Sequence, residues 1–246
     1  MEHTTATMPT IAPLVNVGLC LQALDMAMNR ASHLPGIVCF NGPSGYGKSS
    51  GAAYTANTLN AYYIECRSSW TKKALLQAML KEMGKPFEKM PIYEMTESIS
   101  EQLALSGRPL IIDETDHIVE KQAIEIIRDI YEGSSAAILL IGEERLPQKL
   151  KKWERVHGRI LDWVYAQPAS LADAKHLARL YCNGIEIEDD LLHKVSQMAH
   201  GSVRRICVNL ERIRVEAEML GSSSIGLKQW GNKTLFSGEA PARRVL

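Results

Sequence analysis

The most informative segment of the sequence is Gly42-Pro43-Ser44-Gly45-Tyr46-Gly47-Lys48-Ser49. It fits the pattern GxxxxGK[ST], which is typical of a loop that wraps around phosphate groups. The apolar run Ile37–Phe40 comes directly before it, and the residues from Ser49 to about Leu59 favour a helix. A strand, this loop and a helix in that order are the context that the pattern requires. A chance glycine-rich turn is the weaker interpretation, because the lysine, the hydroxyl, the strand and the helix would all have to coincide.

The composition of this loop predicts its chemistry. Glycines let the backbone approach phosphate oxygens with the amide groups pointing inward, and the helix N-terminus adds partial positive charge. We expect Lys48 to bridge the β- and γ-phosphates of ATP and Ser49 to ligate Mg²⁺. We expect the whole loop, from Gly42 through Pro43, Ser44, Gly45, Tyr46 and Gly47 to Lys48 and Ser49, to bind the nucleotide.

A second motif ends the predicted strand Pro109–Asp113, where two carboxylates follow each other. In an open sheet, this strand can lie beside the strand that precedes the glycine-rich loop. Asp113 would then hold the magnesium ion through water, and Glu114 would polarise the attacking water. A solvated strand end is the alternative. Asp113 to His117 also imitates the DExD/H box of helicases, but two recombinase-like lobes do not fit into 246 residues.

Alternating apolar runs and helical periodicity predict an α/β fold with a mostly parallel sheet flanked by helices. After Gln167 the pattern becomes purely helical, which indicates a small second domain. We therefore expect an N-terminal helix and extension over residues 1–34, a nucleotide-binding core over 35–167, a helical lid over 168–220 and a flexible tail over 221–246. The strands are expected at Ile37–Phe40, Ala61–Cys66, Pro109–Asp113, Ala136–Ile141 and Ile160–Tyr165, and the helices at Leu14–Met28, 49–59, Thr71–Met83, Ile92–Leu105, Val119–Tyr131, Leu171–Tyr181, Leu191–Ala199 and Val203–Leu220.

Composition and charge exclude several classes of protein. The longest apolar stretches fall far short of the roughly 20 residues that cross a bilayer, and Met1–Ala12 lacks the plan of a signal peptide. We expect no membrane partner and a cytoplasmic location. The formal net charge is zero, which argues against coating nucleic acid through bulk positive charge. Any nucleic-acid surface must be a local patch.

Two local basic clusters are candidates for such a patch. Either could face a phosphate backbone, and Trp70 could be a contact beside the first of them. Solvation of helices by the lysines and core packing of Trp70 are the alternatives. The first cluster is Arg67, Lys72 and Lys73, and the second is Arg145, Lys149, Lys151, Lys152, Arg155 and Arg159.

Arginines are also candidates for nucleotide sensing. A switch shared between subunits needs a cation that reaches the γ-phosphate from a neighbour and another that reports from a mobile lid. Arg155 and Arg159 are candidates for the first role, and Arg204 and Arg205 for the second. Ordinary surface charge is the alternative for all four.

Taken together, the glycine-rich loop, the Asp113-Glu114 pair, the Arg159 stretch and Gly201-Ser202-Val203-Arg204 resemble the AAA+ ATPases. The resemblance is to their origin-initiator and transposition-regulator branch. Within that branch, the run from Ile138 through Pro168 is similar to the B proteins of Mu-like transposing phages. By this resemblance Arg159 matches the arginine finger and Arg204 the sensor arginine of the lid.

The resemblance also implies a biological role. It implies an ATP- and Mg²⁺-dependent homo-oligomer, a helical filament or ring, on double-stranded DNA. Such an assembly captures target DNA, delivers it to a transposase and stimulates that enzyme. For a phage-derived protein the location is the cytoplasm of the bacterial host.

The chain departs from the family pattern at two points. Gly142-Glu143 stands where AAA+ proteins commonly have a polar Asn or Thr after the fourth strand. Only about 35 residues precede the first strand, whereas the phage Mu protein has an N-terminal DNA-binding domain. DNA binding would therefore have to come from the ATPase body, and Arg67, Lys72 and Lys73 are its candidate residues. The alternative function is a protein-remodelling, loader or secretion-type AAA+ ATPase that acts on a protein partner without DNA. A small-molecule kinase lacks an obvious acceptor site.

Overall fold

The computed structural model describes residues 11–239, which form two compact units. The core unit comprises Asn16–Ser44 and Lys48–Ala166. The helical unit comprises the described residues up to Val15, the loop tip Gly45–Gly47 and the described residues from Gln167 onward.

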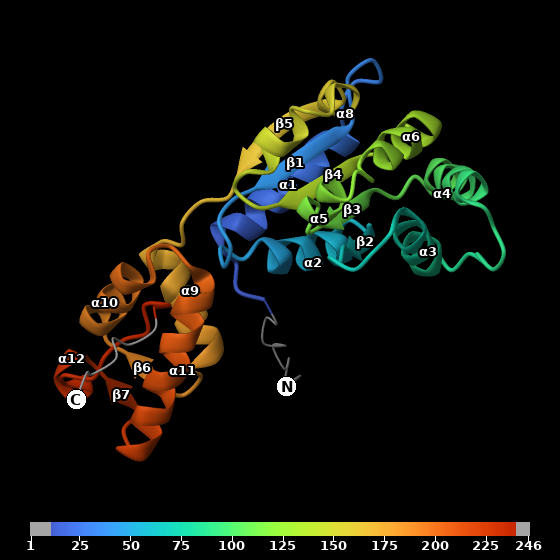
Figure 1. The fold of residues 1–246 in the computed structure, drawn as a ribbon. Coiled ribbons are helices and arrows are strands. Elements are labelled where there is room, and N and C mark those ends of the chain that lie inside the picture. Colours follow the sequence, from blue (N-terminus) through green and yellow to red (C-terminus); the bar gives the residue numbers. More distant parts are fainter. Residues whose placement is uncertain (1–10, 240–246) are drawn as a thin grey trace, which may run out of the picture. The chain divides into compact units, whose positions relative to one another are not determined.

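A five-stranded sheet forms the centre of the core unit (Figure 1). The strand order is β2-β3-β4-β1-β5, and every neighbouring pair is parallel. In a parallel sheet all carboxyl ends share one edge, so the loops after β1, β3 and β4 leave the sheet together. The strands are β1 (Ile37–Asn41), β2 (Tyr62–Glu65), β3 (Leu110–Asp113), β4 (Ile138–Gly142) and β5 (Ile160–Tyr165).

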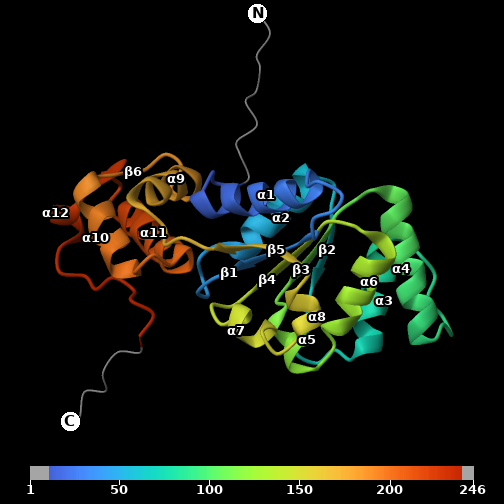
Figure 2. The same ribbon diagram turned by 90° about the horizontal axis from the view of Figure 1, so that it is seen from above.

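Helices cover both faces of this sheet. Figure 2 shows α1 and α2 on one face and α5, α7 and α8 on the opposite face. The second face also packs against α3, α4 and α6 in one apolar cluster, to which the strands contribute side chains such as Ile112 and Leu140. The helices are α1 (Val15–Met28), α2 (Lys48–Thr58), α3 (Lys72–Glu82), α4 (Ile92–Ser106), α5 (Asp116–Glu120), α6 (Glu125–Ser134), α7 (Leu146–Leu150) and α8 (Glu154–His157).

The α/β class with a mostly parallel sheet is therefore confirmed, and five strands stand where the sequence predicts them. The prediction that the Asp113 strand lies beside β1 is wrong, because β4 lies between β3 and β1. The single helix predicted over Val119–Tyr131 is also wrong. Gln122 has a φ of 55°, and the N–H of Ala123 donates to the carbonyl of Ile118 at 2.8 Å, so a left-handed turn separates α5 from α6.

The helical unit contains α9 (Leu171–Tyr181), α10 (Asp189–Ala199), α11 (Val203–Met219) and α12 (Leu227–Trp230). A short parallel ribbon of β6 (Glu186–Ile187) and β7 (Ser224–Ile225) joins them. The sequence predicts a flexible tail from Gly221, but residues 221–239 form β7 and α12 and bury Trp230. Asn209 of α11 fixes this segment through two hydrogen bonds with the backbone of Phe236, at 2.7 and 3.0 Å. The remainder of the predicted tail lies outside the described residues.

Candidate nucleotide-binding site

The glycine-rich loop leaves β1 at Asn41 and enters α2 at Lys48. Gly45 and Gly47 have φ values of 84° and 81°, which are left-handed conformations that only glycine adopts without strain. Gly42 is needed for another reason, since a Cβ at this position would lie 2.7 Å from the Cβ of Ala166. The pattern thus corresponds to a tightly turned backbone at the start of an 11-residue helix.

Lys48 folds back over this loop. Its Nζ donates hydrogen bonds to the carbonyl oxygens of Gly42 and Pro43, at 2.8 and 2.9 Å. Burial lowers the pKa of Lys48, and the charges of Asp113, Glu114 and other acids oppose that shift. The lysine is therefore close enough to the two motif carboxylates to interact with them.

Asp113 is almost fully buried, at 1% exposure, at the carboxyl end of β3. Its Oδ1 accepts the backbone N–H of Glu114 at 2.8 Å, and its Oδ2 accepts the hydroxyl of Tyr63 at 3.0 Å. A buried carboxylate needs such donors to offset lost hydration. No motif of the sequence singles out Tyr63, the residue that donates to Oδ2.

Glu114 follows with a φ of 54°. A non-glycine residue in this region is strained, and such strain is found preferentially at functional sites. Burial raises the pKa of Glu114, and the neighbouring carboxylate of Asp113 raises it further. A carboxyl group whose pKa moves toward neutral pH is suited to accept a proton from water.

The residues present fit ATP with Mg²⁺. The loop offers backbone amides at the N-terminus of a helix, and Lys48 offers a cation that can exchange its carbonyl partners for phosphate oxygens. Ser49 is exposed in the first turn of α2, and Asp113 offers a carboxylate on the same edge of the sheet. Hydroxyl and carboxylate oxygens are ligands that Mg²⁺ prefers.

Within the helical unit, the tip of the loop contacts the start of α11. The N–H of Arg204 donates to the carbonyl of Gly45 at 3.2 Å. Ser202 caps α11 by accepting the N–H of Arg205 at 3.3 Å, and the preceding Gly201 has a φ of 77°. The exposed side chain of Arg204 thus begins next to the loop tip, since a Cβ at Gly45 would lie 3.5 Å from the Cβ of Arg204.

Arg159 lies at the amino-terminal edge of the sheet, where its carbonyl accepts the N–H of Ile37, the first residue of β1. This edge is opposite to the one that carries the glycine-rich loop. The Nε of Arg159 pairs with Glu132 Oε1 at 2.5 Å, and both side chains are 44% exposed. Arg155 is exposed on α8, and the described part of the chain shows no ion pair of its side chain. Neither arginine is placed to contact a nucleotide of its own subunit.

Ion pairs neutralise only two members of the second basic cluster, whereas Arg145, Lys151, Lys152 and Arg155 are exposed and form no ion pair among the described residues. In the second cluster Lys149 pairs with Asp116 and Glu120, at 2.7 and 2.8 Å, and Arg159 pairs with Glu132. In the first cluster, Arg67, Lys72 and Lys73 are exposed, and none of them takes part in an ion pair within residues 11–239. Trp70 is partly buried against the apolar cluster of the core unit, which supports its packing role.

Sequence reasoning missed Asp116 as well as Tyr63. Asp116 is buried, its Oδ2 accepts the backbone N–H of Glu143 at 2.6 Å, and its Oδ1 pairs with Lys149. It therefore links the ends of β3 and β4 to α7. The DExD pattern contains this aspartate and was the signal that could have found it. For Tyr63 no local signal exists, because the contact depends on the order of the strands.

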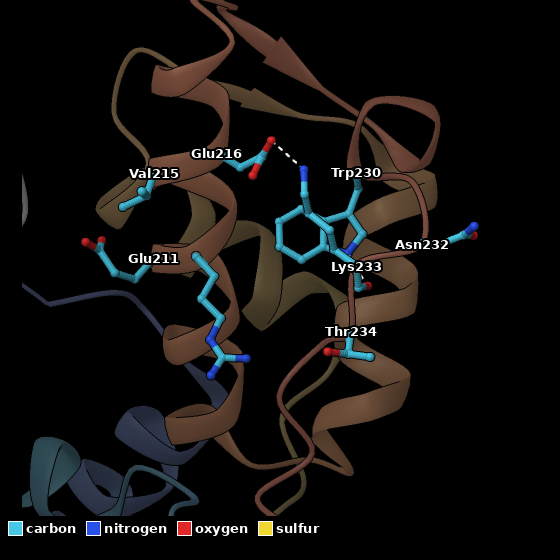
Figure 3. A pocket seen from close by; sticks show the side chains of 8 residues that line it. Glu211, Val215, Glu216, Trp230, Asn232, Lys233 and Thr234 are labelled. Carbon is cyan, nitrogen blue, oxygen red and sulfur yellow. Dashed lines mark hydrogen bonds and ion pairs between the residues drawn. The ribbon is translucent and has the colours of Figure 1, made fainter. Parts of the chain in front are cut away.

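The helical unit holds a separate cavity of about 640 Å³ (Figure 3). Its lining combines groups of both signs, and Lys233 pairs with Glu216 at 2.5 Å. It shares no residue with the glycine-rich loop or the acid pair, so it is not part of the candidate nucleotide site. The lining residues are Glu211, Arg212, Val215, Glu216, Trp230, Asn232, Lys233 and Thr234.

Comparisons with known proteins agree with this geometry. Residues 31–150 match the family model described as an AAA domain. No curated protein matches the sequence.

A search of the described residues for membrane-spanning helices finds none with the required length and apolar character.

Solved structures resemble the chain over most of its length. Cdc6p from Pyrobaculum aerophilum matches with a TM-score of 0.64 and 15% identity, over 90% of this chain and 66% of that one. ORC2 of Aeropyrum pernix, in its ADP form, matches with a TM-score of 0.68 and 16% identity, over 91% of this chain and 69% of that one. RuvB of Thermotoga maritima, a Holliday junction branch migration motor, matches with a TM-score of 0.60 and 19% identity, over 87% of this chain and 66% of that one.

The chain thus spans about two thirds of the length of these proteins. At such identities the likeness concerns the fold, which is that of AAA+ ATPase cores. The AAA-domain match and this fold support an ATP-hydrolysing enzyme.

Proposed function

We propose that the chain is an ATP-dependent, double-stranded-DNA-binding AAA+ ATPase that assembles on target DNA, delivers it to a transposase and stimulates that enzyme. The resemblance of the Ile138–Pro168 run to Mu-like B proteins supports the transposition role. A structure of the Aeropyrum pernix ORC1 protein in complex with DNA is also similar in fold, with a TM-score of 0.61 and 17% identity, over 87% of this chain and 62% of that one. That protein is in complex with DNA, which is consistent with the proposal.

ATP would be held by the loop from Gly42 to Ser49, with Lys48 against its terminal phosphates. Ser49 and Asp113 would hold Mg²⁺, which supplies positive charge to the phosphates. Glu114 would accept a proton from the attacking water, helped by its raised pKa. Burial and two hydrogen bonds restrain the Asp113 carboxylate, so it can offer the same oxygens to each Mg²⁺ ion.

Assembly would complete the site. Arg159 lies at the edge of the sheet away from its own loop, so we propose that it serves a neighbouring subunit as an arginine finger. Arg204, at the start of α11 beside Gly45, would report the state of the nucleotide from the helical unit. In this scheme residues 35–167 are the nucleotide-binding core, and the helical unit from residue 168 acts as the lid.

The single observation that carries the DNA proposal is the position of the first basic cluster, two of whose lysines begin helix α3. Arg67, Lys72 and Lys73 follow β2 at the carboxyl edge of the sheet, and within residues 11–239 no carboxylate neutralises them. Lys72 and Lys73 are the first two residues of α3, where Thr71 is the N-cap. Cations are unfavourable at the positive end of a helix dipole, whereas a phosphate group is favourable there. Two lysines at this end therefore suit a phosphate-bearing partner.

An assembly would repeat this small patch along the duplex. A neutral monomer has little non-specific attraction for DNA, but linked copies multiply it. DNA binding should therefore require ATP, fall steeply with salt and vary little with sequence.

Fluorescence anisotropy of a labelled duplex tests the proposal, with ATP, with ADP and without nucleotide, across a salt series. The variant Lys72→Ala/Lys73→Ala should bind ATP normally but weaken duplex binding, and the salt slope should fall by about two, roughly one for each lost phosphate contact. The matched control is Lys151→Ala/Lys152→Ala, which removes the same charge from an exposed pair in the other cluster.

Equal losses in both double variants would contradict the assignment of the first cluster. Absence of ATP-dependent duplex binding by the wild type, even at low salt and high protein concentration, would overturn the transposition role. A protein-remodelling, loader or secretion-type ATPase would then be the better description.

A further inference from the structure

Tyr63 links strand β2 to the carboxylate proposed to hold the metal. Strands β2 and β3 are parallel neighbours in which Tyr63 pairs with Ile111 and Glu65 with Asp113. Because side chains alternate along a strand, Tyr63 lies on the same face of the sheet as Asp113, two residues before the residue that pairs with Asp113. The long side chain of Tyr63 bridges this offset, and its hydroxyl donates to Asp113 Oδ2 at 3.0 Å.

This hydrogen bond satisfies a carboxylate oxygen, Oδ2, that no backbone group of the described residues contacts. The other carboxylate oxygen, Oδ1, receives the N–H of Glu114, and the Asp113 carbonyl receives the N–H of Cys66. Among the described residues, Tyr63 is thus the side chain that donates to this buried carboxylate. It is also the donor that a substitution can remove without changing the backbone.

We propose that Tyr63 is a positioning residue for magnesium: it holds the Asp113 carboxylate in the single orientation in which Asp113 meets the metal that accompanies ATP. The proposal rests on the function proposed above. With one oxygen held by Tyr63 and the other by Glu114, the carboxylate does not rotate about its Cβ–Cγ bond. Without the phenol only the N–H of Glu114 restrains the group, and ordering the carboxylate on metal binding then costs affinity.

The adjacent residue, Tyr62, provides a matched control. Its side chain lies on the opposite face of the same strand, its hydroxyl accepts a hydrogen bond from Gln102 Nε2 at 2.9 Å, and the Arg108 guanidinium lies 3.8 Å from its ring centroid. Tyr62→Phe and Tyr63→Phe therefore delete the same atom and one side-chain hydrogen bond each. Only the second deletion touches Asp113.

The test is equilibrium binding of a fluorescent ATP analogue at increasing Mg²⁺ concentration, which needs no turnover. For Tyr63→Phe the Mg²⁺ concentration at half-maximal enhancement of binding should rise about tenfold, the lower end of the usual effect of losing a partner of a metal ligand. Binding of the analogue without Mg²⁺ should stay unchanged. Tyr62→Phe should follow the wild-type Mg²⁺ curve.

A double variant tests whether Tyr63 acts through Asp113. If it does, Tyr63→Phe/Asp113→Asn should have the Mg²⁺ dependence of Asp113→Asn alone, because the two effects are not independent. A further loss in the double variant, or a Tyr63→Phe curve that coincides with the wild type, overturns the assignment. If the wild type itself shows no Mg²⁺-dependent nucleotide binding, the proposed function fails as well, so the two failures are distinguishable.

Discussion

Lys48 donates a hydrogen bond to the carbonyl oxygen of Gly42 at 2.8 Å, so the lysine of the phosphate-binding pattern is held by the first glycine of the same loop. The contact places the ammonium over the loop, within the field of the Asp113 and Glu114 carboxylates. The ammonium is thus kept at the loop by carbonyl groups that phosphate oxygens can replace.

We expect Lys48→Ala to weaken ATP binding by about 10- to 100-fold, since a charge-assisted hydrogen bond contributes about 1.5–3 kcal/mol. Equilibrium titration with a fluorescent ATP analogue measures the change. The control is Lys151→Ala, which removes an exposed lysine outside the candidate site. Near-normal binding by Lys48→Ala would refute the assignment of the loop.

Glu114→Gln should bind ATP and Mg²⁺ but hydrolyse ATP at least about a hundredfold more slowly, because the amide keeps the shape of the side chain and cannot accept the proton. The left-handed backbone at this position is present in both proteins, so the comparison isolates the carboxylate. Steady-state phosphate release, with nucleotide binding measured in parallel, checks the result. Undiminished turnover would point to another catalytic base.

The pH dependence of hydrolysis follows from the raised pKa of Glu114, which burial causes first and Asp113 increases. A general base acts only when deprotonated, so the rate should fall as pH falls through this raised pKa. The loss should begin at a higher pH than the ordinary glutamate pKa of about 4.3 predicts. Measuring kcat across a pH series checks this. If the residual activity of Glu114→Gln falls at low pH in the same way, the titration belongs to another group.

The sequence predicted the elements that local patterns specify and missed contacts that depend on strand order. The loop from Gly42 to Ser49 and the acid pair at the end of β3 follow from motif and hydrophobic periodicity. The Tyr63 and Asp113 contact requires knowing that β2 adjoins β3, which no local pattern contains. Residues 221–239 look like a tail because serine and glycine dominate their start, yet Trp230 is buried in the helical unit.

Arg159→Ala should leave nucleotide binding by the isolated subunit unchanged and lower both hydrolysis and ATP-dependent assembly. Its bond to Glu132 is exposed, and exposed pairs contribute little to stability, so the variant should fold normally. A finger supplied by a neighbour predicts that mixing Arg159→Ala with Glu114→Gln restores part of the activity, because some interfaces then combine an intact Arg159 with an intact Glu114.

Mixed assembly must be demonstrated for this experiment, for example by energy transfer between differently labelled variants. Glu132→Gln is the matched control, since it breaks the same ion pair and keeps Arg159. If Arg159→Ala and Glu114→Gln co-assemble, each binds ATP and no activity returns, the finger assignment is wrong.

The surroundings of Gly142, the last residue of β4, leave no room for an Asn or Thr side chain at this position. A Cβ at this position would overlap with Asp116 Oδ2 and lie 2.6 Å from Leu146 Cδ2. Leu146 is buried, and Asp116 is held by Lys149 and by the N–H of Glu143. The space that an asparagine or threonine side chain would enter is therefore filled by the Asp116 carboxylate.

We expect Gly142→Ala to destabilise the protein by about 1–3 kcal/mol, the usual cost of forcing an extra carbon into a packed site. The matched control is Gly18→Ala in α1, where no atom lies within 4 Å of the added carbon and the higher helix propensity of alanine should stabilise by up to about 1 kcal/mol. Urea unfolding of both variants measures the two shifts, which should have opposite signs. A Gly142→Ala variant as stable as the wild type would mean that Asp116 and Leu146 yield readily, and that a polar side chain at this position is compatible with the fold.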